Sequence, residues 1–279
     1  MKKIVIVIFA LIVIIGISFF VFRHGNNNLT GHVIEEIERN DSYSISKVVF
    51  NSDDNKEIYG LFFTPLKNKF DVIIVLPAAA GTKESRRFYG EILVEMGYGS
   101  LVLDQRGIGE TDGYVNSIKE DFDAFSKKGN VHQFLMARDV VKAVDFLQGF
   151  KGIDEIGVFG ESMGGRYAII AGGLDDRVKS IIVISSAGYR GSLGNKEADE
   201  FIMYINPNSH IRKIAPRRLL MLHSINDKVI PIADARYTFS FAFEPKTFIE
   251  FNETECLHGY CEPMRDYIEK ELKKTFEDN

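Results

Sequence analysis

The stretch Gly160-Glu161-Ser162-Met163-Gly164 lies between an apolar run and a segment of small residues that begins at Met163. The apolar run predicts a buried strand and the following segment predicts a helix, so Ser162 is expected on a sharp strand-to-helix turn. Such a turn needs neighbours without bulk, which Gly160 and Gly164 provide. The pattern predicts a serine nucleophile at a helix N-terminus, with the Met163 N–H placed to bind an oxyanion. A glycine-rich structural turn without chemistry is the alternative interpretation.

On both sides of this turn, the chain alternates between strand-like and helix-like segments. Two alternating runs at 43–50 and 57–64 predict an opening hairpin. Further strands are expected at 72–76, 100–103, 156–159, 180–184, 219–223 and 247–251, and helices at 85–96, 132–147, from 163, at 233–241 and from 262. This alternation predicts an α/β fold with a mostly parallel central sheet and helices on both faces. Ligands of such sheets bind at the carboxyl ends of the strands.

Two later loops supply the partners that a serine nucleophile needs. A base must take the hydroxyl proton, and an acid must orient the base and stabilise its positive charge. Asp227 and His258 each follow one of the last two expected strands. The order Ser162, Asp227, His258, with each residue just beyond a strand, predicts a catalytic triad.

The segment 185–213 is expected to form a small lid over the pocket. Tyr189 and His210 lie in this segment and are candidate substrate contacts. His223 ends an expected strand and is expected to pack beneath the loop that carries the acid. A lid of this size suits small or extended substrates better than deeply enclosed ones.

With these residues in place, the chain resembles the α/β-hydrolase superfamily over residues 43–279. The segment 104–113 looks like the Asp-x-Arg-Gly-x-Gly-x-Ser-x-Gly loop of small-lid esterases, serine aminopeptidases and prolyl-oligopeptidase relatives, with Thr111 in place of Ser. The segment 214–231 is similar to the acid-loop signature of dienelactone-hydrolase-like members, with Ser224 where Gly is usual. The resemblance implies the α/β-hydrolase fold and hydrolysis through an acyl-enzyme.

Asp104 and Arg106, within the segment 104–113, are interpreted as a pair that braces this loop near the pocket, without a catalytic role. The two residues carry opposite charges and lie two positions apart.

The resemblance also implies a second oxyanion donor after the strand at 72–76. The family usually shows His-Gly there, whereas this chain has the segment Pro-Ala-Ala-Ala-Gly at 77–81. Because the donor is a backbone N–H, its side chain is partly free, and Ala79 is the position that matches. Ala78 and Ala80 are alternatives, and a tight apolar loop with no donor facing the site is the remaining interpretation.

An apolar run at 4–22 opens the chain and, as a helix, would extend roughly 28 Å, enough to span a bilayer. The expected organisation is a transmembrane anchor at 1–23, a tether at 24–42 and one α/β-hydrolase domain at 43–279. Two lysines precede the run, so the expected location is a single-pass cell-membrane protein with a cytoplasmic N-terminus and the catalytic domain outside. A cleaved signal peptide is the alternative.

Cys256 and Cys261 flank His258 closely in sequence. They can form a disulfide, remain two free thiols, or belong to a metal site. Zinc would need two further ligands that no other nearby cysteine supplies, so no metal is expected.

The charge of the chain sets limits on its partners. The 34 Lys and Arg residues are scattered, and the net charge is −5, so no nucleic-acid partner is expected. The leading hypothesis is a membrane-anchored serine hydrolase that cleaves a small-molecule carboxylic ester without a cofactor or an obligate protein partner. A serine peptidase or aminopeptidase, a thioesterase and an acyltransferase are alternatives on the same triad, and an anchored non-catalytic binding module is the alternative from another class.

Overall fold

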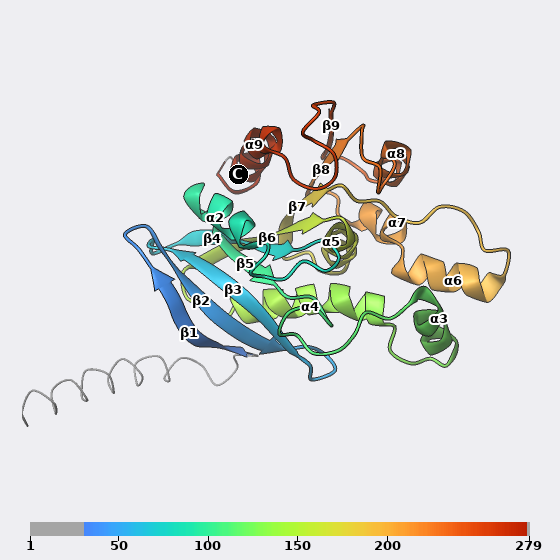
Figure 1. Ribbon diagram of the computed structural model, residues 1–279, viewed down its shortest axis with the longest axis horizontal. Coiled ribbons are helices and arrows are strands. Elements are labelled where there is room, and N and C mark those ends of the chain that lie inside the picture. The colour runs from blue at the N-terminus through green and yellow to red at the C-terminus, as the bar shows by residue number, and fades with distance from the viewer. Residues whose placement is uncertain (1–30, 278–279) are drawn as a thin grey trace, which may run out of the picture.

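A nine-stranded sheet with the strand order β1-β2-β3-β5-β4-β6-β7-β8-β9 forms the centre of the protein (Figure 1). A computed structural model describes residues 31–277. The strands are β1 (Gly31–Arg39), β2 (Tyr43–Asn51), β3 (Glu57–Pro65), β4 (Phe70–Leu76), β5 (Gly99–Leu103), β6 (Ile153–Glu161), β7 (Val178–Ile184), β8 (Arg218–Ser224) and β9 (Lys246–Phe251). The first three strands are antiparallel, and the strands from β4 to β9 run parallel. The carboxyl ends of these parallel strands therefore share one edge.

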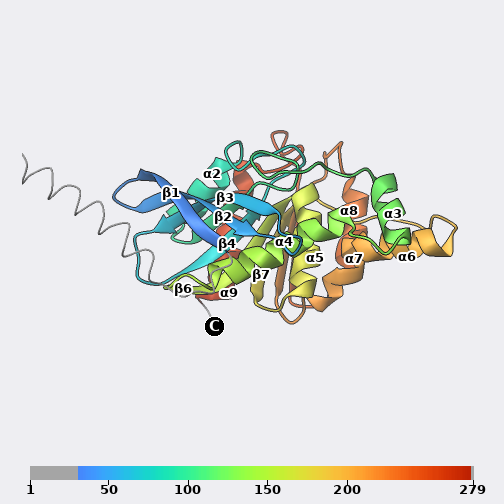
Figure 2. The ribbon, with the colours of Figure 1, turned by 90° about the horizontal axis from the view of Figure 1, so that it is seen from below.

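Helices cover both faces of the sheet. The main helices are α2 (Arg87–Glu95), α3 (Ile118–Ser126), α4 (His132–Leu147), α5 (Met163–Leu174), α6 (Lys196–Ile205), α7 (Pro207–His210), α8 (Ile232–Ser240) and α9 (Arg265–Phe276). Helices α4, α5 and α8 share one hydrophobic core with the sheet, whereas α2 and α9 share the core on the opposite face. Figure 2 shows α4 and α5 lying over the near face. The predicted α/β fold with helices on both faces is confirmed.

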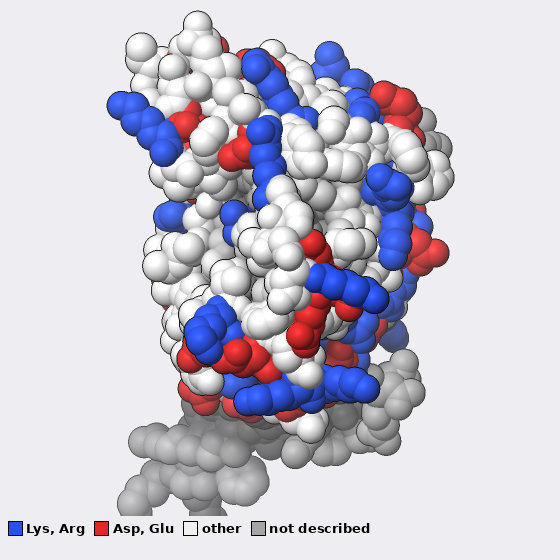
Figure 3. Space-filling model, turned by 90° about the vertical axis from the view of Figure 1, so that its right-hand side faces the viewer, with Lys and Arg blue, Asp and Glu red and all other residues white. Residues whose placement is uncertain are grey.

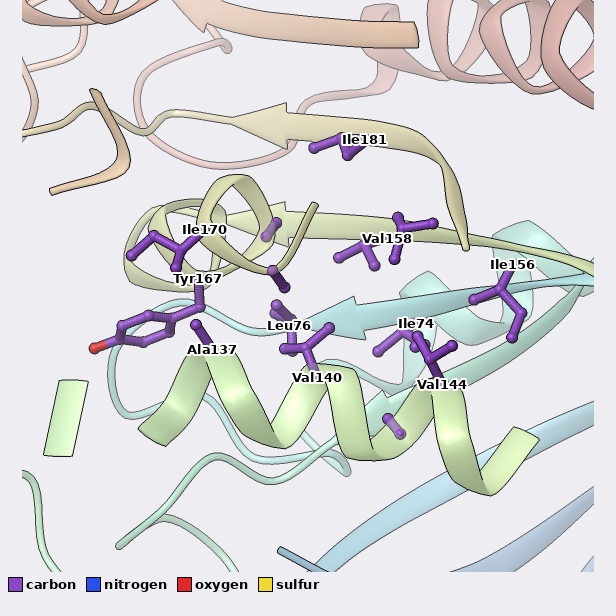
Figure 4. Packing of buried hydrophobic residues seen from close by; sticks show 14 of the residues in the cluster. Ile74, Leu76, Ala137, Val140, Val144, Ile156, Val158, Tyr167, Ile170 and Ile181 are labelled. Atoms are coloured by element: carbon purple, nitrogen blue, oxygen red, sulfur yellow. The ribbon is translucent and has the colours of Figure 1, made fainter. Parts of the chain in front are cut away.

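The core beneath α4 and α5 is built from branched side chains. Val140 and Val144 of α4 point toward Ile74 of β4 and Val158 of β6 (Figure 4), and all four are at most 1% exposed. Full burial of each such side chain stabilises the fold by about 1.5–3 kcal/mol. This core fixes the direction of α5, which begins at the expected nucleophile.

One boundary differs from the expectation. The tether predicted for residues 24–42 was too long, because Gly31–Arg39 form strand β1, which pairs with β2. This edge strand buries none of its residues fully, and its register shifts twice, so its side chains lack the alternation of a half-buried strand. Ile34 and Ile37 of this strand are 42% and 45% exposed, so its apolar residues do not form the buried face by which a strand is predicted from sequence.

The lid is more helical than its sequence indicated. The segment 185–213 contains α6, α7 and a 3-10 turn at Ile211–Lys213. Helix α3, which precedes α4 and packs near α6, was also missed. Its N-terminus has a capping box in which Ser117 and Glu120 bond each other's backbone N–H groups.

Within residues 31–277, no helix is both long enough and apolar enough to cross a membrane. The anchor predicted for residues 1–23 lies outside the described residues.

Candidate active site

Ser162 occupies a strained turn between β6 and α5. Its φ is +52° and its ψ is −112°, a sparsely populated combination that costs a residue with a side chain about 1–3 kcal/mol. The Ser162 N–H donates to the Ile184 carbonyl at 2.9 Å, and the Ser186 hydroxyl donates to the Ser162 carbonyl at 2.7 Å. Hydrogen bonds on both sides of the residue therefore hold the strained conformation, as expected of a nucleophile turn.

The two glycines of the motif are required by close approach. A Cβ atom on Gly160 would lie 2.5 Å from the Gly164 carbonyl oxygen. A Cβ on Gly164 would lie 2.2 Å from the Leu76 carbonyl oxygen and 2.6 Å from the Pro77 carbonyl oxygen. The first turn of α5 consequently lies directly against the beginning of the loop that follows β4.

Asp227 is oriented by the backbone of its own loop. Its Oδ1 accepts hydrogen bonds from the N–H groups of Val229 at 2.8 Å and Ile230 at 2.9 Å. Its Oδ2 lies 2.8 Å from Nδ1 of His258, and its side chain is fully buried. The carboxylate therefore has one oxygen held by the backbone and the other directed at the imidazole.

The loop that carries His258 rests on the residues beside Ser162. The Gly259 N–H donates to the Ser185 hydroxyl at 3.0 Å, and a Cβ on Gly259 would lie 2.3 Å from Oε1 of Glu161. Gly259 also has φ +83°, which favours glycine. The Asp227–His258 pair follows β8 and β9 and Ser162 follows β6, so the pair and Ser162 lie at the same carboxyl edge of the sheet.

Cys256 and Cys261 form a disulfide, with a Cα–Cα distance of 5.3 Å. The sequence left a disulfide, two free thiols and a metal site open, and the structure contains the disulfide. The cross-link closes the loop around His258, and the Ser224 hydroxyl donates to the Cys256 carbonyl. Residues 31–277 contain no group of three or more metal-binding side chains placed to hold an ion.

His223 lies beneath the acid loop, where it was expected. Its Nε2 lies 2.9 Å from the Ile230 carbonyl oxygen and 3.5 Å from Oδ2 of Asp227. Burial lowers the pKa of His223, so the neutral ring with a proton on Nε2 is favoured. This neutral ring supports the loop from below.

The two candidate oxyanion donors lie on either side of the β4–α5 contact. Met163 is the first residue of α5, so its N–H has no acceptor within the helix. Ala79 lies in a turn in which the Gly81 N–H donates to the Ala78 carbonyl at 3.0 Å. No described residue accepts a hydrogen bond from the N–H groups of Ala78, Ala79 or Ala80. These N–H groups remain available to a ligand.

Tyr189 is engaged by α4 and α5. Its hydroxyl donates to Oε1 of Gln133 at 3.0 Å and accepts from Nη1 of Arg166 at 3.0 Å. The Arg166 guanidinium also lies over the tyrosine ring, 4.6 Å from its centroid. Tyr189 borders a cavity of about 370 Å³ between the lid and α8, so its predicted substrate contact stays a prediction.

His210 ends helix α7 of the lid and packs against α5. A Cβ on Gly173, near the end of α5, would lie 2.9 Å from the Cβ of His210. Ser162 precedes the other end of α5, about 16 Å away along the helix axis at 1.5 Å per residue. His210 therefore lies beside the C-terminal part of α5, and its contact with substrate stays a prediction. Burial lowers the pKa of His210, whose Nε2 lies 3.2 Å from the Tyr204 carbonyl oxygen.

Asp104 and Arg106 brace the loop through separate partners, which corrects their interpretation as a pair. Arg106 is 1% exposed and binds Asp54 and Asp139. Burial raises the pKa of Asp139 to about 6 against the opposing effect of this guanidinium. Asp104 instead binds the buried Lys83, with Nζ 2.6 Å from Oδ2.

Two buried charged residues near the site, Lys83 and Glu161, were not predicted from the sequence. Glu161 is 6% exposed and accepts a hydrogen bond from the Tyr89 hydroxyl at 2.9 Å. Lys83 lies in a short polar segment with several charged neighbours, a composition typical of an exposed loop. Only the tertiary contacts reveal that both side chains are buried.

The parallel sheet, the strained turn between β6 and α5 and the loops after β8 and β9 define the α/β-hydrolase fold. Residues 28–187 match the family model for acetyl xylan esterase (AXE1). The chain therefore belongs to the acetyl xylan esterase (AXE1) family.

Solved structures share this fold. The acetyl xylan esterase from Paenibacillus sp. R4 has a TM-score of 0.75 and 18% identity, with 91% of this chain and 89% of that chain covered. Acetyl xylan esterase 1 from Thermoanaerobacterium sp. JW/SL YS485 has a TM-score of 0.72 and 13% identity, with 88% of each chain covered. The YtaP protein of Bacillus subtilis (strain 168) is 31% identical over 156 residues, and these are 51% of this chain. The match spans about half the length of that relative, 51%.

Proposed function

We propose that this enzyme removes acetyl groups from esterified carbohydrate hydroxyls, with Ser162 as nucleophile, His258 as general base and Asp227 as the orienting acid. The observation that carries the proposal is the 2.8 Å contact between His258 Nδ1 and Asp227 Oδ2, in a loop that rests beside the strained Ser162. A weak hydroxyl nucleophile needs this oriented base.

The reaction follows from the atoms that each residue presents. The His258 Nδ1–H donates to Asp227, which leaves Nε2 free to accept the Ser162 proton as Oγ bonds to the acyl carbon. The imidazolium then protonates the departing alcohol, and water, activated by the same nitrogen, hydrolyses the acyl-enzyme. The N–H groups of Met163 and Ala79 would bind the oxyanion, and each such donor contributes about 10²–10³-fold to kcat.

Two observations support a neutral sugar ester as the substrate class. The family and the two similar solved structures carry the name acetyl xylan esterase. On the face at the α6 end, acidic and basic side chains are interspersed without a field of one sign (Figure 3). A neutral acetylated saccharide needs no such field, because hydrogen bonds and apolar contacts bind it.

The proposal extends to location: an anchor at 1–23, a cytoplasmic N-terminus and the catalytic domain outside the cell membrane. The apolar run at 4–22 supports it. A polymeric acetylated substrate does not cross a bilayer, so a domain outside would reach it. Protease added to intact cells should then cleave the domain, and protection until lysis would contradict this location.

The test begins with fluorophosphonate labelling of the full chain. Wild type and the matched control Ser126→Ala, at an exposed serine of α3, should label, whereas Ser162→Ala should not. The labelled enzyme is then assayed on 4-nitrophenyl acetate, butyrate and octanoate, acetylated xylo-oligosaccharides, an acyl thioester and a peptide anilide. Acetate release from the oligosaccharide should dominate. Labelling that persists in Ser162→Ala would contradict the triad, and faster cleavage of the anilide or thioester would contradict the substrate class.

A further inference from the structure

The loop at 77–83, which carries the proposed oxyanion donor Ala79, has little of its own to hold its shape. Three consecutive alanines offer no polar side chain, and Ala79 and Ala80 are exposed. Ala80 has φ +62°, and the Gly81-to-Ala78 hydrogen bond is the loop's internal backbone bond within the described residues. A strained turn of this kind persists only when its surroundings fix it.

The end of the loop is fixed by a buried cation. Lys83 is 1% exposed, and its Nζ lies 2.6 Å from Oδ2 of Asp104, 2.7 Å from Oε2 of Glu110 and 2.8 Å from Oε1 of Glu84. Its backbone N–H donates to the other oxygen of Asp104 at 2.7 Å. A Cβ on Gly109 would lie 2.2 Å from Asp104 Oδ2, so the loop after β5 closes tightly around this carboxylate.

The beginning of the loop at 77–83 is fixed by Gln105, which follows Asp104 in the sequence. Nε2 of Gln105 donates to the Pro77 carbonyl, and Gln105 is 6% exposed. That carbonyl also faces the first turn of α5, where Gly164 makes room for it. Asp104 and Gln105, adjacent in sequence, therefore hold the two ends of the loop against the helix that follows Ser162.

We propose that Lys83 and Gln105 are positioning residues that fix the loop at 77–83 so that its free N–H groups meet the developing oxyanion. The proposal rests on the proposed function, and it explains how the loop works without the His-Gly that related enzymes usually show. A buried ion pair is weak evidence for stability, and the role proposed for this one is to fix the geometry of the loop. Displacement of a catalytic group by about 1 Å can lower the rate about 10²-fold.

The cation is present throughout the working pH range. Burial by itself lowers the pKa of Lys83, but the hydrogen-bonded carboxylates of Asp104, Glu110 and Glu84 outweigh burial and raise it.

The test compares Lys83→Met and Gln105→Leu, which release one end of the loop each. Rates are divided by the concentration of active sites titrated with a fluorophosphonate, so a loss of folded enzyme does not count. We expect kcat to fall about 10- to 100-fold with KM changed less than about threefold, because the lost interaction forms only in the transition state. The affinity for a trifluoromethyl ketone, whose hemiketal oxygen occupies the oxyanion position, should fall by the same factor as kcat/KM.

The matched control is Arg218→Met. Arg218 begins β8, at the end of the strand away from the site, and its guanidinium pairs with the buried Glu271 of α9. This variant should lower the urea midpoint and leave the titrated kcat unchanged. The proposal would be overturned if kcat were unchanged in both Lys83→Met and Gln105→Leu, or if kcat fell as much in Arg218→Met as in these two variants. If Lys83→Met does not fold, Gln105→Leu decides alone, since it removes no charge. Labelling that persists in Ser162→Ala would instead contradict the proposed function.

Discussion

Replacing Asp227 by Asn should block the base while the fold stays intact. Oδ1 of Asp227 accepts two backbone N–H groups, from Val229 and Ile230, and a carboxamide can do this only with its oxygen. The amide NH₂ of the variant must then face Nδ1 of His258, which lies 2.8 Å from the present Oδ2. An N–H donor at that place forces Nδ1 to accept, so the proton moves to Nε2 and the imidazole cannot take the Ser162 proton.

The expected loss in kcat is about 10³- to 10⁴-fold, which corresponds to about 4–5.5 kcal/mol of transition-state stabilisation. Both backbone hydrogen bonds remain, so the free energy of unfolding should change by no more than about 2 kcal/mol. The assay is 4-nitrophenyl acetate hydrolysis with titrated sites, beside urea unfolding. Asp154→Asn, at a surface aspartate paired with Lys69, is the matched control and should match wild type. A kcat of Asp227→Asn within threefold of wild type would refute the reasoning.

Three further changes test the frame of the site. Gly164→Ala should lower kcat about 100-fold and destabilise the fold by about 1–3 kcal/mol, because its Cβ would lie 2.2 Å from a carbonyl oxygen at the end of β4. Gly129→Ala, whose Cβ would lie 3.4 Å from its nearest neighbour, should do neither, and equal kinetics of the two variants would contradict the argument. Burial lowers the pKa of His223, so the stability that its neutral ring provides is complete above the ordinary pKa of about 6.5 and is lost as pH falls through the folded-state pKa. Urea unfolding at pH 7.5 and pH 5 should therefore show a smaller acid loss in His223→Gln, and identical pH slopes would exclude this residue as a cause. Reduction of the Cys256–Cys261 disulfide, or its double replacement by Ser, should lower kcat and the free energy of unfolding, the latter by about 2 kcal/mol, and equal rates with and without dithiothreitol would rule this out.

The fold could be predicted from the sequence where buried strands are continuous apolar runs. The run before the Gly-x-Ser-x-Gly motif and its counterparts later in the chain form parallel strands at the expected places. Strand β1 could not be predicted, because an exposed edge strand lacks a buried face. The lid helices were not predicted, because their start signals are weak. Helix α6, for example, begins at a single Asn195, whose side chain accepts hydrogen bonds from two backbone N–H groups.

The site could be predicted only as far as chain order determines chemistry. Asp227 and His258 each follow a strand, so the topology brings them to one edge, and the structure joins them. Lys83 could not be predicted, because its partners Asp104 and Glu110 lie in another loop and local composition does not mark burial. The position of His210 along α5 could not be predicted either, because the sequence of the lid does not say against which part of α5 it packs.

Backbone strain in this protein is concentrated where the proposed chemistry occurs. Five non-glycine residues within 31–277 have positive φ, and three of them, Ala80, Ser162 and Ser185, follow the neighbouring strands β4, β6 and β7. Each of the three loops has its own support. A buried ion cluster holds the first, a hydrogen bond to the Ile184 carbonyl and one from the Ser186 hydroxyl hold the second, and the Gly259 N–H holds the third. Because strain persists only when independent contacts over-determine it, these supports belong to the machinery that holds the reacting groups in place. Loss of one support should therefore change kcat more than KM, since the oxyanion geometry matters only in the transition state.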